Sequence, residues 1–173
     1  MATTPAEKNI YRQARDNMEL TREEAVDLFT KNNFSMPYER IERIEKDKFD
    51  PTPEEVKWMA KVYKMPELCN YYCTHQCDIG KECVPEIKMK DLSQIVLGML
   101  ASLNSMQRKQ ERLIEITEDG EVSDEELKDF IHIQKELDKI SMTVTTLKLW
   151  SEQQLAEGNI DRAKYEALKE TIK

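Results

Sequence analysis

The sequence is poor in glycine and histidine. Among its 173 residues are only four glycines and two histidines, His75 and His132. The chain has no nucleophile motif, no phosphate-binding loop and no glycine-rich turn, and His132 stands at no catalytic spacing. We therefore expect that the protein is not an enzyme.

Long apolar runs are also lacking, and aromatic residues are few. No apolar stretch approaches the about 20 residues that span a bilayer, and the first residues lack the apolar core of a signal peptide. We therefore expect a cytoplasmic protein without a membrane partner. Aromatic residues make up 7% of the chain and charged residues 35%, a composition that favours an all-α protein over a sheet protein.

Basic residues are outnumbered by acidic ones, and the net charge is −8. Residues 1–66 have 12 Lys and Arg against 13 Asp and Glu, a net charge of −1, whereas residues 67–173 have 14 against 21, a net charge of −7. Phosphate contacts supply most of the nonspecific affinity of a protein for nucleic acid. DNA binding would therefore require a local basic surface or a dimer.

Residues 20–49 have the pattern of two short helices joined by a turn. Thr21 and Glu24 can form a capping box at the start of the first helix. We expect Ser35 to cap the second helix, with Pro37 in its first turn, where a missing N–H group is harmless.

The second helix of this pair is amphipathic. Ile41 and Ile44 would face the core, while Glu39, Glu42 and Glu45 bring negative charge to the helix. The other outward residues are Tyr38, Arg40, Arg43 and Lys46. Two helices in this relation are what a DNA-reading helix-turn-helix needs.

Further helices are predicted on both sides of the pair. Residues 6–18 form the first helix, and Thr52 caps another that opens with Pro53. A fifth helix begins at Pro66 and continues into a cysteine-rich segment.

The segments LTREEAVDLF and RIERIEKDKFDPTPEEVKWMAKVY resemble the Cro/repressor-type (XRE family) helix-turn-helix transcriptional regulators. The resemblance covers roughly residues 6–66, about a third of the chain. It implies an all-α fold with an N-terminal five-helix, lambda-repressor-like DNA-binding domain in residues 1–77. The remainder resembles the C-terminal region of a poorly characterised clostridial-type group of these regulators.

The resemblance also implies roles for individual residues. Tyr38, Glu39 and Arg43 would face base edges with Arg40 nearby, and Arg22 and Lys48 would contact phosphate. Arg43 could read guanine, and Glu39 could accept a hydrogen bond from cytosine. The turn before this helix is longer than in the family and lacks its glycine. A scaffold or protein-binding role without DNA affinity is therefore the alternative.

Four cysteines lie within 15 residues. Cys69, Cys73 and Cys77 are spaced by four and would share one face of a continuous helix, and Cys83 returns after Gly80. Four thiolates could hold zinc or an iron–sulfur cluster. Partly buried thiols or reversible thiol oxidation would explain the same residues, whereas a structural disulfide is not expected in a reducing cytoplasm.

The C-terminal part has the pattern of a helical hairpin. Residues 78–90 are predicted as a connector, and residues 91–173 as the hairpin followed by a short helix at about 160–172. Apolar residues repeat at spacings of four and three on both arms: Leu92, Val96, Met99, Leu103, Met106 and Leu113, then Phe130, Ile133, Leu137, Ile140, Val144 and Leu147. Such an antiparallel hairpin buries little apolar area alone, so we expect it to form a homodimer.

The segment between the arms has a partial calcium-loop pattern. Five residues match the last eight positions of an EF-hand loop: Asp119, Gly120, Val122, Ser123 and Glu126. Its first two ligand positions fall on Glu115 and Thr117, where the loop requires Asp or Asn. A capping box between Ser123 and Glu126 explains these residues without an ion.

These patterns together predict a sequence-specific DNA-binding transcriptional regulator that reads double-stranded DNA as a homodimer. The alternatives are a protein–protein adaptor with a degenerate helix-turn-helix and a metal- or redox-responsive regulator that uses the cysteines.

Overall fold

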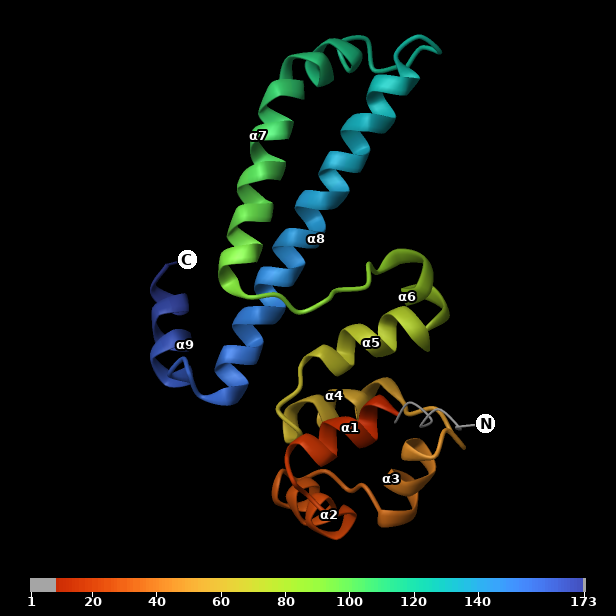
Figure 1. Ribbon diagram of the computed structural model, residues 1–173, viewed down its shortest axis with the longest axis vertical. Helices are drawn as coiled ribbons and strands as arrows, with labels where there is room; N and C mark the ends of the chain where they lie inside the picture. The colour runs from red at the N-terminus through yellow and green to blue at the C-terminus, as the bar shows by residue number, and fades with distance from the viewer. Residues whose placement is uncertain (1–8, 173) are drawn as a thin grey trace, which may run out of the picture. The chain divides into compact units, whose positions relative to one another are not determined.

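The computed structural model describes residues 9–172, which form nine α-helices and no strand (Figure 1). The predicted all-α class is therefore confirmed. Within these residues no helix is long and apolar enough to pass through a bilayer. Two compact units are present: the first holds the residues up to Glu86 together with those from Glu152 onward, and the second holds Ile87–Ser151.

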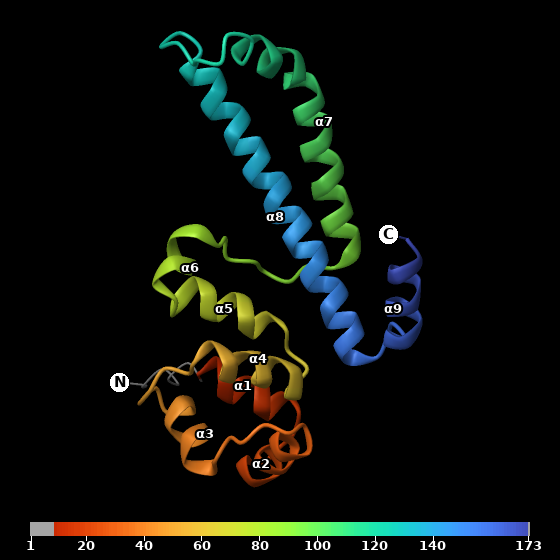
Figure 2. The ribbon, with the colours of Figure 1, turned by 180° about the vertical axis from the view of Figure 1, so that it is seen from behind.

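Most helices of the first unit are short. They are α1 (Ile10–Asn17), α2 (Arg22–Lys31), α3 (Tyr38–Glu45), α4 (Pro53–Val62), α5 (Glu67–His75), α6 (Asp78–Cys83) and α9 (Arg162–Thr171). The second unit holds α7 (Leu92–Ile116) and most of α8 (Leu127–Glu157), whose last residues belong to the first unit. Figure 2 shows the same path of the chain from behind.

Local capping explains where several helices begin. The predicted capping box of Thr21 and Glu24 is present at the start of α2, and Thr52 forms a second box with Glu55 at the start of α4. Asn9 caps α1 by accepting hydrogen bonds from two backbone N–H groups.

Helices α1 and α3 begin later in the chain than predicted. Ser35 does not cap α3, because that helix begins at Tyr38 with Pro37 in the cap position and has no side-chain cap bond. The predicted first helix of residues 6–18 is observed from Ile10 to Asn17, and its residues 6–8 lie outside the described part of the chain.

The core of the first unit lies between α1, α2, α3, α4 and α5. Its buried apolar residues are Tyr11, Ala14, Ala25, Phe29, Met36, Ile41, Ile44, Val56, Met59, Ala60, Val62, Tyr63 and Leu68. Met36 belongs to the loop between α2 and α3 and is only 2% exposed. The loop is therefore anchored in the core, which fixes the position from which α3 begins.

In the second unit, α7 and α8 run in opposite directions (Figure 1). The least exposed residues of α7 repeat at spacings of four and three: Ile95, Met99, Ser102, Met106, Lys109, Leu113 and Ile116. A corresponding row on α8 consists of Asp129, Ile133, Glu136, Ile140, Thr143, Leu147 and Trp150, and Thr146 beside Leu147 is buried as well. We call these two rows the seam. Two ion pairs connect them or their neighbours: Arg112 with Asp129 at 2.8 Å and Lys109 with Glu136 at 3.6 Å.

The seam differs from the apolar rows that the sequence predicted. Leu92, Val96 and Leu103 of the predicted α7 row are 41%, 43% and 48% exposed, and Leu137 and Val144 of the α8 row are exposed as well. The first half of α7 carries two overlapping apolar rows, and spacing alone did not show which of them faces α8.

Candidate nucleic-acid interface

The candidate interface is the outward surface of α3 and the turn that follows it. Ile41 and Ile44 are at most 1% exposed and hold the inner face of α3 in the core. Glu39 and Arg43 are exposed, whereas Tyr38 and Arg40 are half-buried. After α3 the chain turns through Asp47, which has a positive φ of 53°, and the backbone N–H group of Lys48 donates to the carbonyl oxygen of Arg43.

A buried ionic cluster lies beneath this surface. The carboxylate of Glu45 accepts hydrogen bonds from Arg15 Nε at 2.6 Å and from Arg15 Nη2 at 3.0 Å, and a third from Arg22 Nε at 2.8 Å. The Glu45 side chain is 0% exposed. The pKa of Arg15 is raised, mainly by its hydrogen bond with Glu45. The cluster thereby joins α1, α2 and α3.

This cluster changes two interpretations of the sequence. Glu45 does not bring negative charge to the outward face of α3 as predicted, because two arginines neutralise it in the interior. Arg22, predicted to contact phosphate, has a side chain that is 19% exposed and bound to Glu45. The sequence did carry a signal for Glu45, since it follows the buried Ile41 by four residues and so lies on the same helix face.

Arg40 is also held within the protein. Its Nε and Nη2 atoms donate to the two carboxylate oxygens of Glu55 at 2.6 and 2.7 Å, and Nη2 donates as well to the carbonyl oxygen of Asp50 at 3.0 Å. This forked geometry uses the guanidinium edge that would otherwise contact a base or a phosphate. Arg40 therefore connects α3 with the start of α4.

Arg43 has a different environment. Its guanidinium lies over the ring of Phe49, 5.5 Å from the centroid, and that ring is 56% exposed. A cation–π contact uses the face of the guanidinium and leaves its N–H edge able to donate hydrogen bonds. The structure thus adds Phe49, which the sequence did not single out, to the candidate surface.

The neighbouring charges on this surface are mixed in sign. Lys46 pairs with Glu42 at 2.6 Å, and both side chains are substantially exposed. The Lys46 ammonium lowers the pKa of Glu42 through a hydrogen bond. Tyr38 lies beneath Arg22, whose guanidinium carbon is 5.8 Å from the ring centroid. Lys48 is exposed in the turn after α3.

The four cysteines, which could hold zinc or an iron–sulfur cluster, do not cluster as metal ligands in the structure. Helix α5 ends at His75, so Cys77 lies beyond it as the N-cap of α6 and does not continue the row of Cys69 and Cys73. Among the described residues, no three Cys, His, Asp or Glu side chains come together as metal ligands would. Burial, with a contribution from Cys73, raises the pKa of the Cys69 thiol and disfavours the reactive thiolate.

The predicted connector of residues 78–90 contains α6, which packs tightly on α5. A methyl group added at Gly80 would overlap the carbonyl oxygen of Cys73 and approach Cys73 Cα to 2.9 Å. Glycine is therefore required at this contact, and the cysteine-rich segment forms a packed corner of the first unit.

The partial calcium loop has local hydrogen bonds that account for its residues. Asp119 accepts from the backbone N–H group of Glu121 at 3.0 Å, and Glu126 accepts from the backbone N–H group of Ser123 at 3.1 Å. Gly120 has a positive φ of 79° at the turn. These contacts agree with the turn and with one half of the capping box, since the Glu126 backbone N–H group donates to the carbonyl oxygen of Ser123.

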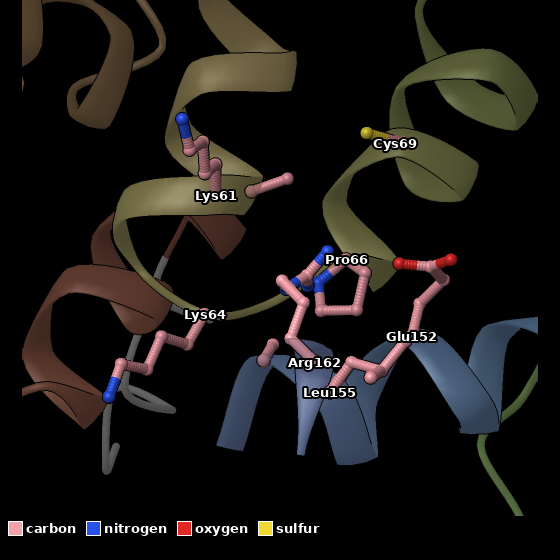
Figure 3. Close-up of a pocket in the computed structure, with 9 residues that line it drawn as sticks. Lys61, Lys64, Pro66, Cys69, Glu152, Leu155 and Arg162 are labelled. Atoms are coloured by element: carbon pink, nitrogen blue, oxygen red, sulfur yellow. The ribbon is translucent and has the colours of Figure 1, made fainter. Parts of the chain in front are cut away.

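The first unit also contains an open cavity of about 640 Å³ (Figure 3). It is lined by Ala60, Lys61, Lys64, Pro66, Cys69, Glu152, Leu155, Ala156 and Arg162. In Figure 3 the amino groups of Lys61 and Lys64 point in different directions, and Lys61 Nζ lies 4.5 Å from the centroid of the Trp58 ring. The cations do not converge, so the cavity defines no anion site.

Comparison of the chain with protein-family models, with curated proteins and with solved structures finds no match.

Proposed function

We propose that the protein is a sequence-specific DNA-binding transcriptional regulator in which α3 enters the major groove. The observation that carries this proposal is the position of Arg43 on the exposed face of α3. Its guanidinium lies over Phe49 with its hydrogen-bonding edge available, whereas Arg22 and Arg40 are engaged with Glu45 and Glu55. A bidentate arginine is the commonest side-chain reader of guanine.

The proposed contacts divide into base readers and phosphate contacts. Arg43, Tyr38 and Glu39 lie toward base edges, with Arg43 on guanine and Glu39 able to accept from cytosine. Lys48 contacts the phosphate backbone from the turn after α3. The ion pairs of Arg15 and Arg22 with Glu45, and of Arg40 with Glu55, form a scaffold that holds α3 in position. Few phosphate contacts per copy favour a homodimer on a two-fold site, where two such helices meet successive major grooves.

The test is selection from a random duplex library with the full chain, followed by affinity measurements on the enriched sequence at two salt concentrations. We expect an enriched two-fold motif whose affinity falls as salt rises, because phosphate neutralisation releases counterions. Absence of any enriched motif, together with no DNA retained at low salt, would refute the proposal.

The variant Arg43→Ala makes the first prediction. We expect it to lose about 1–3 kcal/mol of binding to the selected sequence, roughly 5- to 150-fold, while its affinity for random duplex changes little. Arg108→Ala is the matched control, since Arg108 is an exposed arginine on α7, far along the chain from α3. A variant Arg43→Ala that keeps the wild-type sequence preference would remove Arg43 from the reading surface.

A protein–protein adaptor is the second candidate, and one observation favours it. The outward face of α3 carries the carboxylates of Glu39 and Glu42, which repel phosphate. In this case the same surface would bind a basic protein segment. The salt series separates the two functions, because an adaptor would retain no DNA at low salt.

A further inference from the structure

The two sides of the α7–α8 pair differ in chemistry. A residue that directly follows a seam position is rotated by about 100° around its helix. Because α7 and α8 run antiparallel (Figure 1), the residues that follow seam positions on both helices lie on the same side of the pair. The residues that directly precede seam positions lie together on the opposite side.

The side that follows the seam is apolar. Its large apolar residues are Val96, Leu100, Leu103 and Ile114 on α7 and Leu137 and Val144 on α8, and they are between 37% and 61% exposed. From Val96 to Ile114 on α7 and from Phe130 to Val144 on α8, every position that follows a seam residue is uncharged. We call this the uncharged side.

The opposite side has ordinary surface chemistry. Arg108 on α7 and Lys128, Lys135 and Lys139 on α8 each directly precede a seam residue and are exposed. The α7–α8 pair therefore presents a side with exposed basic residues and an apolar side. The large residues of the apolar side stay exposed among the described residues. An exposed apolar face of this kind marks an interaction surface.

Two charge-free segments of the sequence contribute to the uncharged side. Residues 92–107 contain no charged residue, although charged residues make up 35% of the chain, and residues 140–147 contain none either. Depletion of charge is the compositional mark of an interface core. A helix face meant for water would carry charges at its exposed positions.

We propose that the uncharged side packs against the same side of a second copy, so that two α7–α8 pairs form a four-helix bundle. With a two-fold axis through this side, the charge-free segments of one copy, residues 92–107 and 140–147, pack against those of the other copy. A nucleic acid or a strongly charged protein segment would find no complementary charge there. The second copy is thus the occupant that the chemistry of the surface matches.

The size of the surface suits a dimer. Helix α7 has 25 residues, which corresponds to a length of about 37 Å, and a face two helices wide measures about 18–20 Å. The face therefore offers about 700 Å² per copy, close to the about 800 Å² per partner of a stable protein interface. This pairing rests on the proposed function in that it names the dimer surface of the proposed regulator. It can be tested in the absence of DNA.

The test is sedimentation equilibrium of the full chain in the absence of DNA. We expect wild type to be a dimer at micromolar concentration and Leu137→Lys to weaken dimerisation at least tenfold, because it places a charge in the centre of the interface. Met142→Lys is the matched control: Met142 is 42% exposed, Leu137 is 45% exposed, and Met142 directly precedes a seam residue. This control should dimerise like wild type.

Circular dichroism of each variant establishes that the helices are retained, and Leu100→Lys on α7 repeats the test from the other helix. A wild type that stays monomeric up to about 100 µM, well above the micromolar range, would overturn the proposal. Equal effects of Leu137→Lys and Met142→Lys would overturn it as well. Loss of DNA binding by a variant that still dimerises would concern the proposed function alone.

Discussion

At the scale of single residues, Glu45 holds α3 to α1 and α2 through buried ion pairs. Its carboxylate is 0% exposed and neutralises Arg15 and Arg22, whose side chains are 8% and 19% exposed. Removal of one partner from a buried ion pair leaves a charge without compensation, which costs far more than the pair itself contributes.

We therefore predict that Glu45→Gln lowers the free energy of unfolding by about 3 kcal/mol, measured by urea denaturation. Glutamine keeps the volume of the side chain and one acceptor oxygen, so the loss reports the missing charge together with the second acceptor, which becomes an N–H donor. Glu42→Gln, one turn away on the outward face, is the control and should change the denaturation midpoint little, because its ion pair with Lys46 is solvated. Equal midpoints for both variants would show that the buried ion pairs of Glu45 do not stabilise the fold more than the exposed ion pair of Glu42 does.

The sequence predicted the residues of α3 better than their roles. The exposed positions of Glu39 and Arg43 follow from the local period that places Ile41 and Ile44 in the core. The engagement of the arginines does not follow from that period. Arg22 meets a carboxylate 23 positions away and Arg40 one 15 positions away, so their partners depend on how helices pack.

At the scale of elements, the contact between α5 and α6 makes a clear prediction. Because a methyl group at Gly80 would overlap the backbone of Cys73, Gly80→Ala should destabilise the first unit by about 1–3 kcal/mol, as overpacking does. Thermal unfolding followed by circular dichroism measures the change.

The same substitution elsewhere in the chain provides the control. Gly98 lies in the interior of α7, and a methyl group there would have nothing within 4 Å. Gly98→Ala should therefore stabilise its helix by up to about 1 kcal/mol, because alanine loses less backbone entropy than glycine. If both substitutions destabilise the protein, the loss at Gly80 is not specific to the α5–α6 contact.

Elements whose signal is local were predictable, and those decided by packing were not. The capping boxes of Thr21 and Thr52 involve residues three apart, so the sequence alone locates the starts of α2 and α4. The choice between two apolar rows on α7 depends on which of them meets α8. Helix α6 was missed because its six residues are few, and glycine at its centre has the usual appearance of a break.

At the scale of the whole molecule, the two units bury their apolar residues very differently. The first unit has a continuous core of 13 buried apolar residues, whereas α7 and α8 leave many large apolar side chains exposed in a single copy. Local stability follows buried apolar contact. The first unit should therefore be stable alone, while the stability of the α7–α8 pair should depend on a second copy.

Amide hydrogen exchange measured at two protein concentrations tests this difference. When the dimer dominates, the monomer fraction falls as the inverse square root of concentration, so a hundredfold rise should slow exchange in α7 and α8 by about tenfold. Exchange in α2, α3 and α4 should not change. Leu137→Lys should speed exchange in α7 and α8 at both concentrations, because more of the protein is monomeric, and leave the slow exchange of those three helices intact. Slow exchange in α7 and α8 that does not depend on concentration would contradict this prediction. It would mean that the α7–α8 pair of a single copy is stable without association.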